Sequence, residues 1–219
     1  MTKNYQIAID GPSGAGKSTI AKAVAARLGI EYVDTGAMYR AVALKMLSRG
    51  IPMREDETLL KMLEETDIDF SCGRVYLDGE DANALIRTAE ISKAASDCSA
   101  FASVRKKLVE LQQAMGRSKS IIMDGRDIGT VVLADAPYKF FLTADDEQRA
   151  RRRYKELVEK GESCSFEQVL SELRQRDYND TNREVTPLRK AEDADEIDST
   201  DMSIEAVTDY ICGKITENA

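Results

Sequence analysis

The 219-residue sequence contains no histidine and no tryptophan, and it is poor in proline and cysteine, with four of each. Without histidine, Ser-His-Asp and Cys-His catalysis are excluded, and so is any metal site built on imidazole. The net charge of −8 argues against a general nucleic-acid binder, which is normally basic. The sequence has no apolar run of about 18 residues and no signal peptide, so we expect no membrane partner.

The four cysteines, Cys72, Cys98, Cys164 and Cys212, lie far apart and form no Cys-x-x-Cys pair. This spacing favours reduced thiols in a cytoplasmic protein over a framework of disulfides. The length suits one domain over residues 1–219 with small inserted regions.

Short apolar segments alternate with amphipathic ones along most of the chain. The apolar segments predict strands at 5–10, 31–34, 120–124, 138–143 and 196–199. The amphipathic segments predict helices at 17–28, 37–49, 58–65, 91–114, 147–160, 166–178 and 204–215, with a polar loop over 179–190. This alternation predicts an α/β fold of three layers, in which a mostly parallel five-stranded sheet lies between helices.

The region 67–86 differs from its surroundings because it is rich in short strands. We expect strands at 67–70, 74–77 and 80–84, separated by turns at Gly73 and Gly79. A β-rich stretch of this kind inside a strand-and-helix alternation indicates an insertion.

The strongest motif runs from Gly11 to Ser18 and matches G-x-x-x-x-G-K-[ST], with a predicted strand before it and a helix after it. The glycines let the backbone aim successive N–H groups at one point, and the helix N-terminus adds its positive dipole end. Lys17 can neutralise the β and γ phosphates of a nucleotide, and the Ser18 hydroxyl can bind Mg²⁺. This is the loop of the P-loop NTPase fold. The residues expected to hold the nucleotide are Gly11, Pro12, Ser13, Gly14, Ala15, Gly16, Lys17, Ser18 and Thr19.

The loop establishes a nucleoside triphosphate site without identifying the reaction, because kinases, GTPases and ATP-driven switches all use it. A GTPase would need an Asn-Lys-x-Asp motif to read guanine, and the sequence has none. Motor and transporter ATPases usually have a larger chain and a longer hydrophobic strand that ends in an acid. The small size and the scattered arginines favour phosphoryl transfer to a small acceptor.

Several arginines lie where predicted strands end. Arg40 follows the second strand and Arg126 follows the third, whereas Arg176 and Arg183 flank the late polar loop. Ligands of α/β sheets bind at the carboxyl ends of strands. Phosphoryl transfer needs cations on both donor and acceptor phosphates, and guanidinium groups grip phosphate bidentately. The alternative for each arginine is a surface ion pair, but the strand-end placement favours ligand binding for Arg40 and Arg126.

Asp124 and Asp127 also follow the third strand, and their chemistry leaves three interpretations open. One of them could hold Mg²⁺ or its water. One could accept a hydrogen bond from the amino group of an acceptor base. Both could simply form the turn and cap a helix.

The basic segment Arg149–Arg153 suggests nucleic-acid binding, but acidic residues surround it and Tyr154 is the one neighbouring aromatic residue. We interpret it as a solvated helix face paired with those acids, with one arginine reaching the donor phosphates.

Three segments carry a family resemblance. Ile9-Asp-Gly-Pro12 runs into the phosphate loop, and Asp34-Thr-Gly-Ala-Met-Tyr-Arg40 is followed by Asp124-Gly-Arg-Asp-Ile-Gly-Thr130. Asn182-Arg-Glu-Val-Thr-Pro-Leu-Arg189 then leads to Ile197-Asp-Ser-Thr200. Together these segments resemble bacterial cytidylate kinases, of the nucleoside monophosphate kinase family, over nearly the whole chain. The resemblance implies phosphorylation of CMP and dCMP by ATP and Mg²⁺, in a monomer that binds no nucleic acid.

The resemblance also assigns regions and residues. It implies an acceptor-binding region at 37–105, containing the insert at about 67–86, and a helical lid at 158–185. Ser96, Arg105 and Asp127 would read the cytosine edge. The remaining acceptor contacts would come from Arg40 and Arg126 at the phosphate, Thr35 and Asp180 near the ribose or phosphate, and Arg176 and Arg183 from the lid. The catalytic set would be Lys17, Arg126, Arg176 and Arg183. Asn179 and Thr181 are neutral where some relatives carry arginines, so the number of lid cations stays open.

The chemistry of the bases agrees with this assignment. Asp127 can accept from the cytosine amino group, and Arg105 can donate to O2 and N3, whereas uracil would turn an acceptor toward Asp127. Two alternatives remain. Another small-molecule kinase would share everything except the cytosine readers, and a non-enzymatic regulator would share only the loop.

The excess acid is concentrated at the end of the chain. Residues 184–219 hold 3 basic and 10 acidic side chains, whereas residues 1–125 hold 17 of each. The segments with the expected phosphate contacts are therefore close to neutral, and the net charge does not exclude an anionic substrate.

Overall fold

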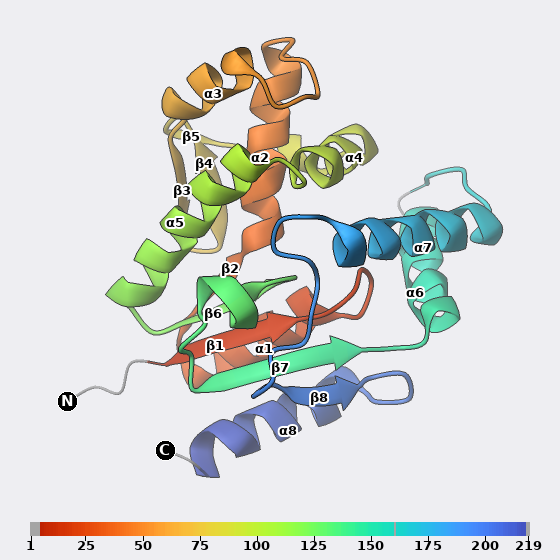
Figure 1. Ribbon diagram of the computed structural model, residues 1–219. Coiled ribbons are helices and arrows are strands. Elements are labelled where there is room, and N and C mark those ends of the chain that lie inside the picture. Colours follow the sequence, from red (N-terminus) through yellow and green to blue (C-terminus); the bar gives the residue numbers. More distant parts are fainter. Residues whose placement is uncertain (1–4, 160, 218–219) are drawn as a thin grey trace.

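The computed structural model describes residues 5–159 and 161–217, and its centre is a five-stranded sheet (Figure 1). The strands run parallel in the order β2-β6-β1-β7-β8. Their bounds are β1 Gln6–Asp10, β2 Glu31–Asp34, β6 Ile121–Gly125, β7 Tyr138–Thr143 and β8 Asp195–Asp198. The five predicted core strands are confirmed, within one residue at each end, and the sheet is parallel throughout.

Helices cover both faces of this sheet, which confirms the three layers. Alternate residues of a strand point to opposite faces. Ile7 and Ile9 of β1 join a buried cluster with α1 (Lys17–Leu28) and α8 (Ile204–Glu217). Ala8 joins a second buried cluster on the other face, formed with α2 (Thr35–Ser48) and α5 (Ala102–Ser118).

The strands predicted within 67–86 form a second, three-stranded antiparallel sheet in the order β3-β4-β5, although the third is only Glu80–Asp81 and does not reach residue 84. Phe70 and Val75 from this sheet are buried in the same cluster as α2, so the insert packs against the helix that follows β2. Figure 1 shows this part above the main sheet. Its elements are α3 Glu57–Glu64, β3 Ile68–Ser71, β4 Arg74–Leu77, β5 Glu80–Asp81, the single turn η1 Leu85–Arg87 and α4 Ala89–Cys98.

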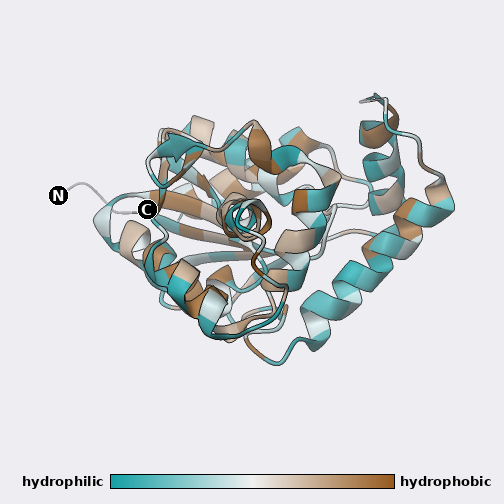
Figure 2. Cartoon of the chain, turned by 90° about the horizontal axis from the view of Figure 1, so that it is seen from above, coloured by the Kyte–Doolittle hydropathy of each residue, from teal (hydrophilic) through white to brown (hydrophobic). Residues whose placement is uncertain are grey.

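The helices α6 (Asp146–Glu159) and α7 (Phe166–Asn182) pack on each other beside the sheet. They have a small buried cluster of their own, which includes Ala150, Leu157 and Val169. In Figure 2, hydrophilic residues predominate along this pair, and hydrophobic residues are common in the strands at the centre of the molecule. Helix α6 was expected to reach Lys160, which lies outside the described residues.

Two predicted segments differ from the structure in where their helices end. The single helix predicted at 91–114 is two helices, α4 and α5, with a turn at 99–101 between them. The Ser99 N–H still bonds back to Ala95, but Phe101 is extended, and neither proline nor glycine marks the break. The polar loop predicted over 179–190 begins only at Arg183, because α7 continues to Asn182, whose side chain donates to the Tyr178 carbonyl at 2.8 Å.

The sequence pattern missed the short helix η2 (Ile128–Val132), which follows β6 directly. All four cysteines are free. Over 5–159 and 161–217, each helix is too short or too polar to cross a membrane.

Candidate active site

The phosphate loop occupies the carboxyl end of β1 and leads into α1. Gly14 and Gly16 have φ angles of +73° and +88°, a region that favours glycine. A Cβ at Gly11 would lie 2.0 Å from the Leu142 carbonyl oxygen, so a side chain there would push the loop off β7. Lys17 is buried, and its Nζ donates to the Pro12 carbonyl at 2.7 Å. Burial, and next the Arg126 charge, lower the Lys17 pKa to about 7.

Ser18 and Asp124 bring two oxygens together beside this loop. The Ser18 hydroxyl donates to Asp124 Oδ2 at 2.8 Å, and the Tyr32 hydroxyl donates to Asp124 Oδ1 at 2.8 Å. Burial raises the pKa of Asp124, with the Asp34 charge acting in the same direction. A hydroxyl beside a carboxylate suits Mg²⁺, which takes one or two protein oxygens and completes its shell with phosphates and water. Among the described residues, no three His, Cys, Asp or Glu side chains form a metal cluster.

A cavity of about 220 Å³ opens between the loop, α2, α4, β6 and α7. It gathers every residue that the resemblance assigned to the acceptor. These are Thr35, Arg40, Ser96, Arg105, Arg126, Asp127, Arg176, Asp180 and Arg183, together with Ser13, Gly14, Lys17 and Ser18 from the loop. Gly14 through Thr19 also line a second hollow of about 750 Å³, which shares Asp34 and Arg40 with the first. Gly11 and Pro12 line neither of the two, because they form the support of the loop.

Three arginines meet at the loop end of the cavity. Arg126 Nε donates to Asp180 Oδ2 at 2.7 Å, and Arg40 Nη2 donates to Asp34 Oδ2 at 2.9 Å. Arg176 is half-buried, and its Nε is inaccessible to solvent and has no hydrogen-bond partner in the described part of the chain. Burial, and next the Arg126 charge, lower the Arg176 pKa to about 10. An inaccessible N–H without a hydrogen-bond partner is costly, and three guanidinium groups at this end of the cavity make it suited to an anion.

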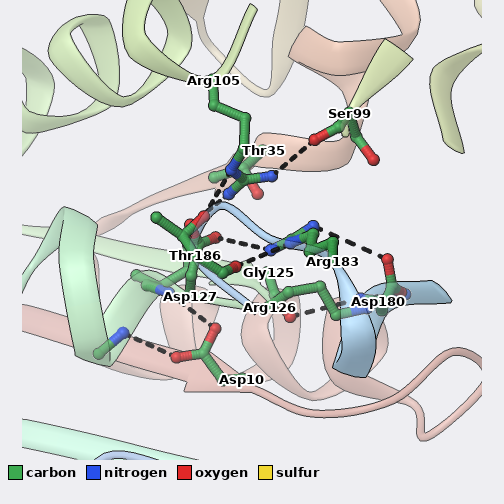
Figure 3. Close-up of polar contacts among 12 residues, drawn as sticks. Asp10, Thr35, Ser99, Arg105, Gly125, Arg126, Asp127, Asp180, Arg183 and Thr186 are labelled. Atoms are coloured by element: carbon green, nitrogen blue, oxygen red, sulfur yellow. Dashed lines mark hydrogen bonds and ion pairs between the residues drawn. The ribbon is translucent and has the colours of Figure 1, made fainter. Parts of the chain in front are cut away.

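The other end of the cavity is formed by Arg105 and Asp127, which make a buried ion pair (Figure 3). Arg105 is only 2% exposed, its Nη1 donates to the Ser99 carbonyl at 3.1 Å, and its guanidinium lies 5.5 Å from the Tyr39 ring centre. The break between α4 and α5 therefore leaves the Ser99 carbonyl available to accept from Arg105. Ser96 lies on the same wall, on α4.

Arg183 and Thr35 connect the two ends. Arg183 lies 3.8 Å from both Asp127 Oδ1 and Asp180 Oδ1, so it links the Arg105–Asp127 pair to the Arg126–Asp180 pair. Burial, and next the Arg105 charge, lower its pKa. The Thr35 hydroxyl donates to the Asp124 carbonyl at 2.6 Å, which fixes the start of α2 against the end of β6.

Several residues that contribute to the site escaped the sequence analysis. Both oxygens of Asp10 accept backbone N–H bonds from η2, Oδ1 from Ile128 at 2.8 Å and Oδ2 from Gly129 at 2.7 Å. These bonds fix the turn that carries Asp127. Asp10 ends the first strand, but an acid at that place is equally consistent with a loop, and the sequence held no further signal.

The sequence analysis did not assign Asp177 and left the role of Arg149 open. Asp177 on α7 and Arg149 on α6 tie these two helices to the phosphate loop. Asp177 Oδ1 accepts from the Ser13 N–H at 2.9 Å, and Asp177 Oδ2 accepts from Arg149 Nη1 at 2.5 Å. Arg149 Nη1 also donates to the Ser13 carbonyl at 2.8 Å. Arg151 and Arg153 instead pair with acids on the exposed face of α6, as the interpretation of a solvated helix predicts.

Comparisons with known proteins agree with this geometry. The family model described as cytidylate kinase matches residues 7–217. The cytidylate kinase of Clostridioides difficile (strain 630) is 50% identical over 212 residues, which cover 97% of this chain and 98% of the relative. That of Caldicellulosiruptor saccharolyticus is 53% identical over 209 residues, covering 94% and 92%.

The crystal structure of an uncharacterized protein from Eubacterium ventriosum ATCC 27560 has a similar fold. It is 15% identical, with a TM-score of 0.53, and the likeness covers 98% of this chain and 99% of that one. At this identity the likeness concerns the fold alone. Because the family model spans nearly the whole chain and full-length relatives share half of its residues, the chain belongs to the cytidylate kinase family.

Proposed function

We propose that this chain transfers the γ-phosphoryl group of ATP to CMP and dCMP, forming CDP and dCDP by direct in-line transfer. The observation that carries the proposal is the division of the cavity. One end holds Lys17, Arg126 and the incompletely partnered Arg176, and the other holds the buried Arg105–Asp127 pair. A nucleoside monophosphate has the same division, with an anionic phosphate at one end and a hydrogen-bonding base at the other.

The donor side of the proposal rests on the loop and on Ser18. ATP would place its phosphates in the loop over residues 11–18, where backbone N–H groups and the start of α1 favour negative charge. Ser18 and Asp124 would hold Mg²⁺, which supplies charge neutralisation at the β and γ phosphates. The larger hollow beside Gly14–Thr19 leaves room for the rest of the donor nucleotide.

Base selection would depend on Asp127 and Arg105. A carboxylate accepts from the 4-amino group of cytosine and repels the 4-oxo group of uracil. Arg105 carries donors for O2 and N3. Because both side chains are buried and already hydrogen-bonded, they can reject a mismatched edge without first being ordered.

The chemical step needs no general base from the protein, because the acceptor phosphate is already ionised. An oxygen of that phosphate forms a bond to the γ-phosphorus as the bond to the β–γ bridging oxygen breaks, and ADP leaves with the bonding pair. Arg126, Arg176 and Arg183 would stabilise the charge that spreads over the transferring group. A lid over 158–185 would close on both nucleotides and exclude water, while 37–105 would hold the acceptor. We place the enzyme in the cytoplasm as a monomer, as the family resemblance implies.

A panel of acceptors tests the proposal. Purified protein is given ATP and Mg²⁺ with CMP, dCMP, UMP, AMP or shikimate, and kcat/KM is measured for each by following ADP. CMP and dCMP should exceed AMP and shikimate at least tenfold, because only cytosine matches Asp127 and Arg105. Equal rates with AMP or shikimate would overturn base reading, and ATP binding without turnover of any acceptor would indicate a regulator instead.

Two matched controls sharpen this experiment. Lys17→Met should abolish turnover, whereas Lys61→Met, on the exposed face of α3, should leave it unchanged. ATP made chiral at the γ-phosphorus tests the in-line step: one direct transfer inverts that centre, and retention would require an intermediate on the protein.

A further inference from the structure

Thr186 contacts two of the arginines that face the cavity, although it does not line the cavity itself (Figure 3). Arg105 Nε donates to Thr186 Oγ1 at 2.5 Å. Arg183 Nε donates to the Thr186 carbonyl at 2.7 Å. One residue just beyond α7 therefore holds a guanidinium from α5 with its side chain and a guanidinium from the end of the lid with its backbone.

The contact with Thr186 completes the orientation of Arg105. Of the five N–H groups of a guanidinium, Nε–H goes to Thr186, one on Nη1 goes to Ser99 and one on Nη2 goes to Asp127. These three bonds leave the plane of Arg105 no freedom to rotate. The second N–H on each terminal nitrogen is then fixed in direction on a side chain that lines the cavity. Without the Thr186 bond, the fork could swing about its remaining two partners.

The backbone of Thr186 is also unusual. Its φ angle is +45°, a left-handed conformation that a β-branched residue rarely adopts, and Pro187 follows it. The surrounding contacts hold it there, since the Leu188 N–H donates to the Asp180 carbonyl at 2.8 Å and the Leu188 side chain is buried. Glycine would adopt this φ without strain, but it would not supply the hydroxyl that accepts from Arg105 Nε.

We infer that Thr186 is a positioning residue for base selection: its hydroxyl fixes the Arg105 fork so that the free N–H groups meet the cytosine edge. This inference rests on the proposed function, in which Arg105 reads the base. Through Arg183, the same residue links that orientation to the position of the lid. Thr186 itself touches no substrate.

The test compares Thr186→Val, which keeps the shape and removes the hydroxyl, with Thr186→Ser, which keeps the hydroxyl. Thr186→Val should raise the KM for CMP about tenfold, because a bond to a charged donor is lost, while kcat and the KM for ATP change less than twofold. Thr186→Ser should restore the wild-type KM. Thr58→Val, the same change at an exposed position on α3, should have no effect.

A second readout distinguishes positioning from folding. In protein labelled at arginine Nε, the Arg105 Nε–H resonance should be protected from solvent exchange in wild type and Thr186→Ser and lose that protection in Thr186→Val. Wild-type turnover of CMP is measured first, and its absence would overturn the proposed function. With wild-type turnover intact, an unchanged KM for CMP in Thr186→Val, or equal losses in the Val and Ser variants, would overturn the inference alone.

Discussion

Arg126 and Asp180 form a partly buried ion pair, 2.7 Å between Nε and Oδ2, that joins the end of β6 to helix α7. Burial alone would raise the pKa of Asp180, but the charges of Arg126 and then Arg176 hold it below its ordinary value. The carboxylate therefore stays ionised between three guanidiniums, since Arg183 lies 3.8 Å from its other oxygen. The pair therefore holds α7 against the end of β6.

Arg126→Lys should keep the charge of this side chain and lose the fork that Asp180 and a phosphate would share. We expect kcat with CMP to fall by about 10²- to 10³-fold, as for the loss of a donor that acts on developing charge. Steady-state kinetics with saturating ATP measures the effect. Arg151→Lys is the matched control, because Arg151 forms an exposed pair with Glu147 on α6. A kcat for Arg126→Lys within twofold of wild type would remove Arg126 from the catalytic set.

Asp10 predicts how the stability of the folded protein depends on pH. Burial is the main cause that raises its pKa from 3.8 to about 6. The folded state therefore holds this proton more tightly than the unfolded chain does, so the neutral carboxyl contributes stability below about pH 4. That contribution is lost as the pH rises through about 6.

Urea unfolding of wild type and Asp10→Asn between pH 4 and about 7 measures this contribution, because the amide does not titrate. The unfolding free energy of wild type minus that of Asp10→Asn should fall as the pH rises through that range, and then stay level. A rise in this difference over the same range would instead show that the folded state favours the charged carboxylate of Asp10.

Two glycines should respond in opposite ways to the same substitution. Gly11→Ala places a Cβ 2.0 Å from the Leu142 carbonyl at a φ of +147°, so it should cost about 2 kcal/mol of unfolding free energy or more and weaken ATP binding. Gly213→Ala, inside α8, meets no atom within 4 Å and should add about 0.5–1 kcal/mol. Denaturant unfolding and ATP titration check both. Equal effects would mean that the loop does not need glycine at Gly11.

The fold was predictable where local pattern decides it. Buried parallel strands are short apolar runs, and the phosphate loop is a contiguous motif, so β1, α1 and the strands that follow could be placed from the sequence. The break at Ser99 could not be placed, because serine and alanine continue the helical pattern and tertiary contacts alone end α4 there. The extension of α7 was missed because polar residues are as common at helix ends as in loops.

Only some of the candidate site residues could be predicted from the residues themselves. Lys17, Ser18 and the strand-end arginines followed from motif and position, whereas Ser96 and Arg105 came only from the family resemblance. Asp10, Asp177 and Thr186 each accept at least one hydrogen bond from a residue 81 or more positions away, and no local pattern carries that information.

The ratio of kcat/KM for CMP to that for UMP, measured in wild type and in Asp127→Asn, tests most directly whether the Arg105–Asp127 pair reads cytosine. An asparagine amide can turn either its oxygen or its amino group toward the base, so it can accept from cytosine or donate to uracil. The thermal midpoint of each protein is recorded alongside, since Asp127 is also the partner of a buried arginine. We predict that the ratio falls at least tenfold in Asp127→Asn. A ratio equal to that of wild type in a folded variant would contradict base reading by this pair.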